Sequence, residues 1–527
     1  MRNFAFPGRS PVYATRAMCA TSHPLATVAA LEQLKSGGNA IDAAIAAVAV
    51  LSVVEHPMTG IGGDCFAMIA KPGTKPVAFN ASGRAPNAAT PEWYAKQGIK
   101  SIPLQSPHAV TVPGAIDGWA RLLKDYGTRS FADVLARAIE YAEGGYIIAP
   151  RVAYDWSKLT EKLSFHPGAR QHLLPGGRPP KVGEKVRFPE LGRTLRAIAD
   201  KGRDAFYTGE IAADMVAELT ELGGLHTMED FASQASSYVE PISVRYRSAD
   251  LYELPPSNQG IVALIMLRVL ERLGPISDDP LSTERYHLMM EAGRQAYALR
   301  DAFVADPDMA EVPVEHMLSD AVADEIARRI DRKKRSELGP VPKPAGNDTI
   351  YLSVVDSNGM AVSFINSLFS AFGTGIVTRK TGITLHNRGQ GFVLDPKHLN
   401  CIAPGKRPMH TLVPAMAFKD GKPWLSFGVM GANFQPMGHA YVMTNMLDYG
   451  MNAQAALDHP RAFFEDDQIK LEASMPRSVF DGLTAAGHKV VVNESPWGGG
   501  QIVEMDHANG VLIGASDPRK DGMAAGY

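Results

Sequence analysis

The residue with the clearest chemical potential in this chain is Thr349, which opens a strand-like segment, 349–356, of alternating character. A threonine hydroxyl is a weak nucleophile unless a base lies beside it. If the chain is cut between Asp348 and Thr349, the new α-amine has an ordinary pKa of about 7.7–8.0 and can act as that base near neutral pH. The setting fits an enzyme that attacks amides or esters through a threonine. An ordinary strand threonine fits it too.

The residues before Thr349 have the composition of an exposed linker. A charge run is followed by 339–346, which holds three prolines and two glycines. Both residue types interrupt regular structure, and proline also lacks an amide hydrogen. If the chain is cut before Thr349, the pieces are a large subunit, 1–348, ending in the flexible linker 331–348, and a small subunit, 349–527.

Periodicity and turn residues indicate a helix-rich middle and a strand-rich last third of the chain. Three hairpins are predicted, with turns at Ser357-Asn358-Gly359, Asp420-Gly421 and Asn509-Gly510. The other expected strands lie near 65–70, 77–81 and 249–253, and the expected helices are 23–35, 43–54, 261–273 and 286–303. Because strands fall on both sides of Thr349, the two pieces should share their sheets and form one intertwined unit.

The composition excludes several classes of protein. Of 527 residues, 45% are hydrophobic and 21% are charged, with a net charge of −3, which is ordinary for a soluble globular protein. No basic face is indicated that would bind nucleic acid. The longest apolar run, 43–54, is too short to span a bilayer, and 1–14 lacks the apolar core of a secretory signal. We expect a cytoplasmic protein without membrane or nucleic-acid partners.

The sequence carries no recognisable metal or cofactor motif. Cys19, Cys65 and Cys401 are far apart, so we interpret them as buried side chains in a reducing compartment. There is no HExxH motif and no Cys/His cluster. The glycines of 59–64 precede a strand and lack a phosphate-loop lysine, so tight packing of a turn is the better interpretation. We predict neither a metal nor a cofactor.

Longer motifs resemble those of the γ-glutamyltranspeptidase family. The residues Thr349-Ile350-Tyr351-Leu352-Ser353-Val354-Val355-Asp356 and Asn358-Gly359-Met360-Ala361-Val362 resemble the start of its small subunit. Further similar motifs follow the family's order: Gly60-Ile61-Gly62-Gly63, Val112-Pro113-Gly114, Pro255-Pro256-Ser257, Phe372-Gly373-Thr374-Gly375-Ile376-Val377, Pro404-Gly405-Lys406-Arg407-Pro408 and Asp448-Tyr449-Gly450-Met451-Asn452. The resemblance spans nearly the whole chain, which makes it more specific than any single motif.

This resemblance implies an N-terminal-nucleophile hydrolase with a four-layer αββα sandwich of the α/β class. It implies self-cleavage between Asp348 and Thr349, with Thr349 as the nucleophile and no cofactor. Ser367 occupies the position of a family threonine that supports the nucleophile. Gly431 and Ala432 occupy the positions of two glycines whose backbone N–H groups form the oxyanion hole, and both keep an N–H. The oligomeric state stays open, with a homodimer of heterodimers as one arrangement.

The residues that bind the glutamyl group in the family are changed in this chain. Phe369 stands where the family has an asparagine, Arg388 where it has a glutamine, and Gly391 where it has an aspartate. The paired serines become His410 and Thr411. A carboxylate that would pair with an ammonium is lost and a guanidinium is gained.

The family's carboxylate-binding arginine falls on Ser82, with Arg84 two residues further on. Because arginine suits bidentate carboxylate recognition, we expect Arg388 and Arg84 to bind a carboxylate, with His410 and Thr411 lining the pocket. The substrate would then be a small anionic amide, as for the hydrolase-like branch of the family that includes oxamate amidohydrolase.

Other interpretations stay open. The chain could be a γ-glutamyl hydrolase or transferase that acts on glutathione-like amides, or an enzyme similar to cephalosporin acylases. Its altered pocket also fits a relative that is never processed and only binds a ligand. His410 could be an ordinary hydrogen-bonded core histidine, and Arg84 and Arg388 could be structural ion-pair partners.

Overall fold

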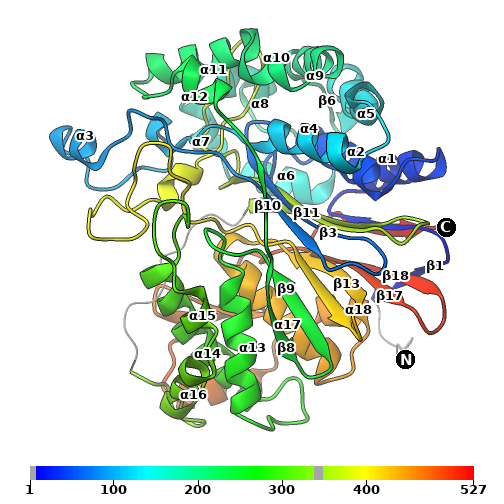
Figure 1. Ribbon diagram of the computed structural model, residues 1–527, viewed down its shortest axis with the longest axis vertical. Helices are drawn as coiled ribbons and strands as arrows, with labels where there is room; N and C mark the ends of the chain where they lie inside the picture. Colours follow the sequence, from blue (N-terminus) through cyan, green and yellow to red (C-terminus); the bar gives the residue numbers. More distant parts are fainter. Residues whose placement is uncertain (1–7, 338–347) are drawn as a thin grey trace.

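Two packed β-sheets form the centre of the molecule, with helices on both outer faces, in a computed structural model that describes residues 8–337 and 348–527 (Figure 1). Helices of the first half of the chain cover one sheet, and α13, α14 and α17 cover the other. This is the four-layer αββα sandwich that the family resemblance implied.

Each sheet has seven strands, and each takes strands from both sides of residue 348. The β10 sheet has the order β19 (Met523–Gly526), β2 (Met18–Thr21), β10 (Asp348–Val355), β11 (Ala361–Phe369), β3 (Asp64–Ala70), β4 (Val77–Ala81) and β7 (Ser237–Val239). The β13 sheet has the order β1 (Val12–Ala14), β18 (Val511–Ser516), β17 (Gly500–Asp506), β13 (Lys422–Val429), β12 (Ala415–Lys419), β9 (Ala249–Glu253) and β8 (Ile242–Tyr246). Neighbouring strands in both sheets are antiparallel.

The helices divide between the two outer layers and the surface. The first half of the chain forms α1 (Pro24–Lys35), α2 (Ala40–Val54), α3 (Pro91–Lys96), α4 (Ala115–Tyr126), α5 (Phe131–Gly144), α6 (Pro150–Ser157), α7 (Thr160–Ser164), α8 (Pro167–Leu173), α9 (Pro189–Lys201), α10 (Arg203–Tyr207), α11 (Glu210–Glu221) and α12 (Met228–Ala232). The second half forms α13 (Ile261–Arg272), α14 (Thr283–Phe303), α15 (Val314–Met317), α16 (Asp320–Arg329), α17 (Gln435–Leu447), α18 (Ala453–Asp458) and α19 (Arg477–Ala485). The smaller pieces are β5 (Tyr146–Ile147), β6 (Lys185–Val186), β14 (Ala462–Glu465), β15 (Gln468–Leu471), β16 (Val490–Val492) and the 3₁₀ turns η1 (Pro107–Ala109), η2 (Pro175–Gly177), η3 (Arg388–Gly391) and η4 (Ala432–Phe434).

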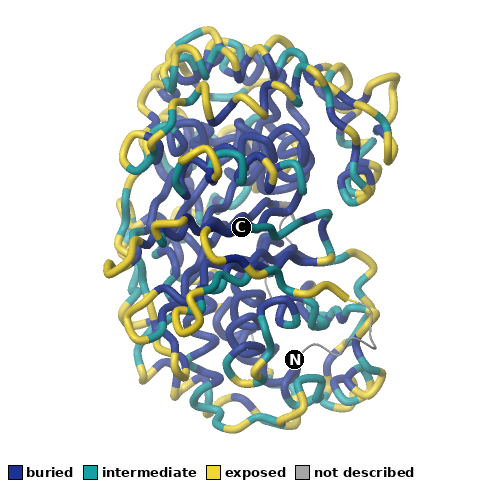
Figure 2. The backbone as a smooth tube through the Cα atoms, turned by 90° about the vertical axis from the view of Figure 1, so that its right-hand side faces the viewer, coloured by how far each residue is buried: buried dark blue, intermediate teal, exposed yellow. Residues whose placement is uncertain are grey.

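The strand β10 shows why the layers form. Its alternate residues Ile350, Leu352 and Val354 belong to the apolar core under α2, whereas Tyr351 and Val355 belong to the core between the sheets. A strand directs successive side chains to opposite faces, so β10 is apolar on both sides and must lie in an inner layer. The darkest, most buried part of the tube in Figure 2 accordingly runs through the middle of the molecule.

The sequence-based elements agree closely with the structure. The strands predicted at 77–81 and 249–253 have those bounds, and all three predicted hairpins form, as β10–β11, β12–β13 and β17–β18. The helix predicted at 286–303 begins earlier, at Thr283, because the Ser282 hydroxyl caps it by accepting from the Arg285 N–H. The three cysteines are buried, as predicted. In the described ranges, no helix is long and apolar enough to cross a membrane.

The predicted linker, 331–348, falls partly outside the described residues, which omit 338–347. Residues 331–337 form irregular bends and are anchored to the body. The Arg335 N–H donates to the Ala486 carbonyl at 2.8 Å, and the Ser336 N–H donates to Glu291 Oε2 at 3.0 Å. The sequence predicted its irregularity but not its attachment.

Candidate active site

Thr349 is buried at the start of β10, beside a bulge in the pairing of β10 with β11. Bulges turn side chains out of the regular alternation and are common beside active sites. The Thr349 Oγ1 donates to Ser367 Oγ at 3.1 Å, and Ser367 Oγ accepts from the Phe369 N–H at 2.7 Å. The structure thus brings together Thr349 and Ser367, both of which the sequence analysis singled out.

The glycine-rich turn at 60–63 packs directly behind this pair. A Cβ on Gly63 would lie 2.2 Å from the Ser367 carbonyl oxygen, and one on Gly62 would lie 2.3 Å from the Thr384 carbonyl oxygen. No side chain fits at such distances, so these positions need glycine for close backbone approach. The interpretation of this turn as a packing element is confirmed.

Residues 430–432, here called the Gly431 turn, directly follow β13. Strand β13 packs face to face against β10 of the other sheet. Ser353 Oγ lies 2.7 Å from Ser426 Oγ, and a Cβ on Gly428 would lie 2.5 Å from the Tyr351 ring. Thr349 lies two residues before Tyr351 and Gly431 lies three residues after Gly428, so we expect the two segments to approach each other at this end of the strands. Gly431 and Ala432 are both left-handed, with φ of 117° and 45°, and α17 begins three residues later. Backbone N–H groups at a helix start suit a developing anion.

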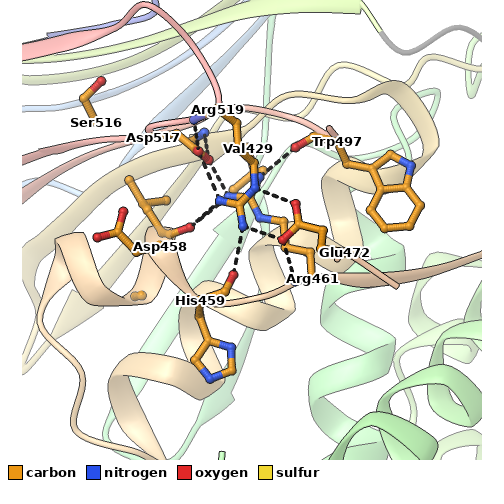
Figure 3. A network of polar contacts seen from close by, with 12 residues as sticks. Val429, Asp458, His459, Arg461, Glu472, Trp497, Ser516, Asp517 and Arg519 are labelled. Atoms are coloured by element: carbon orange, nitrogen blue, oxygen red, sulfur yellow. Dashed lines mark hydrogen bonds and ion pairs between the residues drawn. The ribbon is translucent and has the colours of Figure 1, made fainter. Parts of the chain in front are cut away.

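A buried ion network around Arg461 and Asp517 (Figure 3) fixes a segment that contacts the Gly431 turn. Arg461 Nη1 donates to the Trp497 carbonyl at 2.8 Å, and Asp517 Oδ2 accepts from the Gly500 N–H at 2.8 Å. Burial would raise the pKa of Asp517, but Arg461 and Arg519 hold it below its usual range. The segment 497–500 fixed in this way contacts the Gly431 turn, since the Met430 N–H donates to the Gly499 carbonyl at 3.2 Å.

Gln259 joins the Gly431 turn to the segment that carries His410 and Thr411. Its Nε2 donates to the Ala432 carbonyl at 2.7 Å and to the Thr411 carbonyl at 3.0 Å, and its N–H donates to the His410 carbonyl at 2.9 Å. Arg300 Nη1 in turn donates to Gln259 Oε1 at 2.6 Å. The sequence analysis missed this role, although Gln259 lies only two residues after the Pro255-Pro256-Ser257 motif that it quoted.

Arg388 lies in the 3₁₀ turn η3 and is buried, with 1% of its surface exposed. Its Cζ is 4.1 Å from the centre of the Phe369 ring, and Nη1 donates to Thr411 Oγ1 at 2.7 Å. Nη2 is buried without a hydrogen-bond partner among the described residues. Burial lowers the pKa of Arg388 to about 9, although the Asp64 carboxylate favours the charged form. Phe369 therefore links the arginine to Ser367 and Thr349.

Asp64 and two histidines complete the buried polar part of the site. Asp64 Oδ1 accepts from the Gly83 and Gly114 N–H groups, at 3.0 and 3.1 Å. Asp64 Oδ2 lies 3.2 Å from His410 Nε2 and 3.6 Å from His386 Nδ1. Burial would raise the pKa of Asp64, but His386, His410 and Arg388 outweigh it and lower that pKa. The structure thus places His410, a predicted site residue, against Asp64, whereas the sequence analysis did not single out Asp64 and His386 as site residues.

Three further residues from the sequence analysis, Arg84, Ser82 and Gly391, lie in other surroundings. Arg84 Nη2 lies 2.9 Å from Asp308 Oδ2, Arg84 Nη1 donates to the Gly405 carbonyl at 2.8 Å, and the Arg84 side chain is 34% exposed. Ser82 is buried, and its hydroxyl donates to Asn80 Oδ1 at 2.7 Å. Gly391 ends η3, and its carbonyl accepts from Asn400 Nδ2 at 2.7 Å. None of the contacts described for these three residues joins them to Thr349 or Arg388.

Comparison with known proteins shows the family to which the chain belongs. The family description "Gamma-glutamyltranspeptidase" matches residues 26–527. The chain is 37% identical to the glutathione hydrolase-like YwrD proenzyme of Bacillus subtilis, covering 98% of this chain and 99% of that one. It is also 37% identical to the oxamate amidohydrolase proenzyme of Klebsiella pneumoniae, covering 97% and 99%.

A solved structure extends the comparison to three dimensions. The cephalosporin acylase of Bacillus halodurans superimposes with a TM-score of 0.93 at 40% identity, covering 100% of this chain and 99% of that one. Family, relatives and fold therefore agree. The chain belongs to the γ-glutamyltranspeptidase family and is an autoprocessed N-terminal-nucleophile enzyme of the amidohydrolase and transferase type.

Proposed function

We propose that this enzyme hydrolyses the amide bond of a small, carboxylate-bearing substrate, of which oxamate is the simplest candidate. Cleavage between Asp348 and Thr349 gives the large subunit, 1–348, and the small subunit, 349–527. Because both sheets contain strands from both pieces, the subunits stay associated after the cut. We expect the enzyme in the cytoplasm, given its three separate buried cysteines.

The reaction follows from the groups around Thr349. In the mature enzyme the α-amine takes the proton from Oγ1, and the oxygen attacks the amide carbon. The Gly431 and Ala432 N–H groups stabilise the resulting oxyanion, and Ser367 holds Oγ1 in place. The protonated amine passes its proton to the leaving nitrogen, which departs as ammonia from oxamate. Water activated by the same amine then hydrolyses the acyl-enzyme and restores Thr349.

The observation that carries the substrate class is the buried Arg388 guanidinium. One of its nitrogens is hydrogen-bonded to Thr411, and the buried Nη2 has no hydrogen-bond partner in the described part of the chain. A buried donor on a charged group is costly to leave unmet, so a ligand that fills it gains affinity. A carboxylate satisfies both the charge and the hydrogen bond. Arg84 already has Asp308 and Gly405 as partners and is a weaker candidate.

A direct comparison of substrates tests the proposal. Ammonia release from oxamate should exceed release of the aniline from a γ-glutamyl anilide, measured as kcat/KM on the mature enzyme. A clear preference for the γ-glutamyl anilide would instead identify a γ-glutamyl hydrolase or transferase, as the likeness to the YwrD proenzyme would favour. Preference for a β-lactam side-chain amide would identify an acylase, the activity named for the structural neighbour.

A denaturing gel tests the remaining alternative, a relative that is never processed. The proposal requires two fragments of about 37 and 19 kDa from the 56.7 kDa chain. A single full-length band from correctly folded protein would favour a binding protein that is never processed.

A further inference from the structure

The buried cluster of Asp64, His386 and His410 lies beside Arg388 but takes no part in the reaction proposed above. Arg388 favours the ionised form of Asp64 and disfavours the protonated form of both histidines. All four side chains are buried, with at most 1% of their surface exposed. Charges held this close in a dry environment respond strongly to a new charge.

The hydrogen bonds define which ring nitrogens carry protons. His410 Nδ1 accepts from the Leu412 N–H at 3.3 Å, so its Nε2 carries the proton that points to Asp64. His386 Nε2 lies 2.8 Å from the Thr111 carbonyl, which can only accept, so that nitrogen carries the proton of the neutral ring. His386 Nδ1 is then a bare acceptor, and it faces Asp64 Oδ2, another acceptor, at 3.6 Å.

The hydrogen bonding of the His386 ring is therefore incomplete. Its Nδ1 is buried and has no hydrogen-bond partner within 8–337 and 348–527. One proton on Nδ1 would turn two facing acceptors into an ion pair and would leave the bond to Thr111 intact. The geometry offers a proton site that the neutral ring leaves unfilled.

We infer that His386 takes up a proton from solvent on Nδ1 when a carboxylate binds Arg388, so that anion binding is coupled to proton uptake. This inference rests on the proposed function, because it needs an anion at Arg388. The incoming carboxylate adds one negative charge, and the proton adds one positive charge, so the buried cluster keeps its net charge. The new imidazolium donates to Asp64 Oδ2 and still donates to the Thr111 carbonyl.

The electrostatics act in the same direction. Burial lowers the pKa of His386, Asp64 opposes that effect, and Arg388 adds to it. A carboxylate that neutralises Arg388 removes the last contribution and adds an attraction. The other titratable groups that face this ring are His410 and His226. The pKa of His386 therefore rises on binding, and affinity falls as pH rises between the free and bound values, by up to about tenfold per pH unit.

Titration calorimetry of the mature wild-type enzyme with oxalate measures this coupling. Binding heats recorded in two buffers of different ionisation enthalpy, near pH 6.5, about the ordinary pKa of histidine, give the number of protons exchanged. We expect uptake approaching about one proton per oxalate. Oxalate that binds with no uptake overturns the inference and leaves the proposed function standing. Oxalate that does not bind at all overturns both.

Two variants assign the proton to His386. His386→Gln keeps a side-chain donor for the Thr111 carbonyl but cannot be protonated, so oxalate should bind with the proton uptake abolished and with a flatter pH dependence. His56→Gln is the matched control, because His56 is equally buried with an unpartnered Nδ1 but packs against Trp156 and Phe188. It should keep the wild-type uptake. Uptake that persists in His386→Gln, or disappears equally in His56→Gln, contradicts the assignment. If His386→Gln does not fold, the wild-type proton count still decides whether the coupling exists.

Discussion

The Thr349 side of the site and the Arg388 side hold their polar groups in different ways. Around Thr349 the groups are hydroxyls and backbone N–H groups, fixed by strands and by close glycine packing. Around Arg388 they are a guanidinium, a carboxylate and two imidazoles, brought together from a 3₁₀ turn, a strand start and loops. The groups around Thr349 are uncharged. The groups around Arg388 include a buried cation and a buried carboxylate, whose charges offset each other.

This difference suggests how one scaffold can serve several substrates. A nucleophile on a sheet, with an oxyanion turn braced by a buried ion network, can be retained while the recognition residues change. We expect that replacing a few side chains beside Phe369 changes the charge that the site accepts without moving Thr349. Variants on the first side should therefore affect all substrates alike, and variants on the second side should affect anionic substrates selectively.

The largest effect is expected for Thr349→Ala, which removes the nucleophile itself. Processing and turnover should both be lost, seen as a single band at 56.7 kDa and no product from any substrate. Thr349→Ser is the control and should retain both activities in part, since it keeps a hydroxyl beside the amine. A Thr349→Ala protein that matures and turns over would refute the role of this residue.

Breaking the network behind the Gly431 turn should have the next largest effect. Arg461→Met leaves the Asp517 carboxylate with one cation fewer and should cost about 3–5 kcal/mol of unfolding free energy, measured by urea denaturation. Because the turn serves every substrate, kcat should fall equally for oxamate and for the γ-glutamyl anilide.

Arg477→Met provides the control for that experiment. Arg477 pairs with Asp481 on the surface, with its side chain 84% exposed, so its loss should cost less than about 1 kcal/mol. A fall in rate confined to oxamate in Arg461→Met would contradict the assignment of this network to the Thr349 side.

Arg388→Gln restores the residue type of the family and should weaken recognition of the anion. Losing one charge-assisted hydrogen bond costs about 1.5–3 kcal/mol, or roughly 10- to 150-fold in kcat/KM for oxamate. The unfolding free energy is expected to change little, because the substitution removes a buried charge that has no carboxylate in direct contact. The γ-glutamyl anilide should be affected much less.

Arg84→Gln is the comparison for Arg388→Gln. Its partly exposed ion pair with Asp308 should contribute at most about 1 kcal/mol. Steady-state kinetics of both variants decide between the two arginines. A larger loss of oxamate turnover in Arg84→Gln than in Arg388→Gln would move the anion site to Arg84.

The smallest effect is expected for Ser367→Ala, which removes the hydroxyl that contacts Thr349 Oγ1. A neutral hydrogen bond contributes about 0.5–1.5 kcal/mol, so kcat should fall roughly 2- to 12-fold for both substrates. Ser367→Thr keeps a hydroxyl and should stay close to wild type. Equal losses in the two variants would show that packing, not the hydroxyl, matters at this position.

Local pattern was enough to predict many of the strands and helices, whereas the four-layer architecture was implied by the family resemblance. Strands such as 77–81 and 249–253 have clear apolar periodicity, and short turns such as Asp420-Gly421 fix their hairpins locally. The linker anchor was not predictable in this way. Arg335 contacts Ala486, a residue far away in the chain that no pattern near Arg335 indicates.

The residues of the candidate site also differ in how far the sequence could predict them. Thr349, Ser367 and the Gly431 turn could be identified because each occupies a position matched by a family motif. Asp64 and His386 could not, because their partners are far away in the chain. Asp64 and His410, for example, are 346 residues apart. Only the pairing of β3 with β11, which sets Asp64 opposite Ser367, places that carboxylate beside the site.

The most direct test of the anion-recognising pocket is a crystal structure of the mature enzyme with oxalate. One carboxylate of oxalate should lie within about 3 Å of Arg388 Nη2. The other carboxylate should lie near Thr349 Oγ1 and the N–H groups of Gly431 and Ala432. Oxalate bound at Arg84, or a well-ordered site in which Nη2 faces a protein group instead of the ligand, would contradict the proposed role of Arg388.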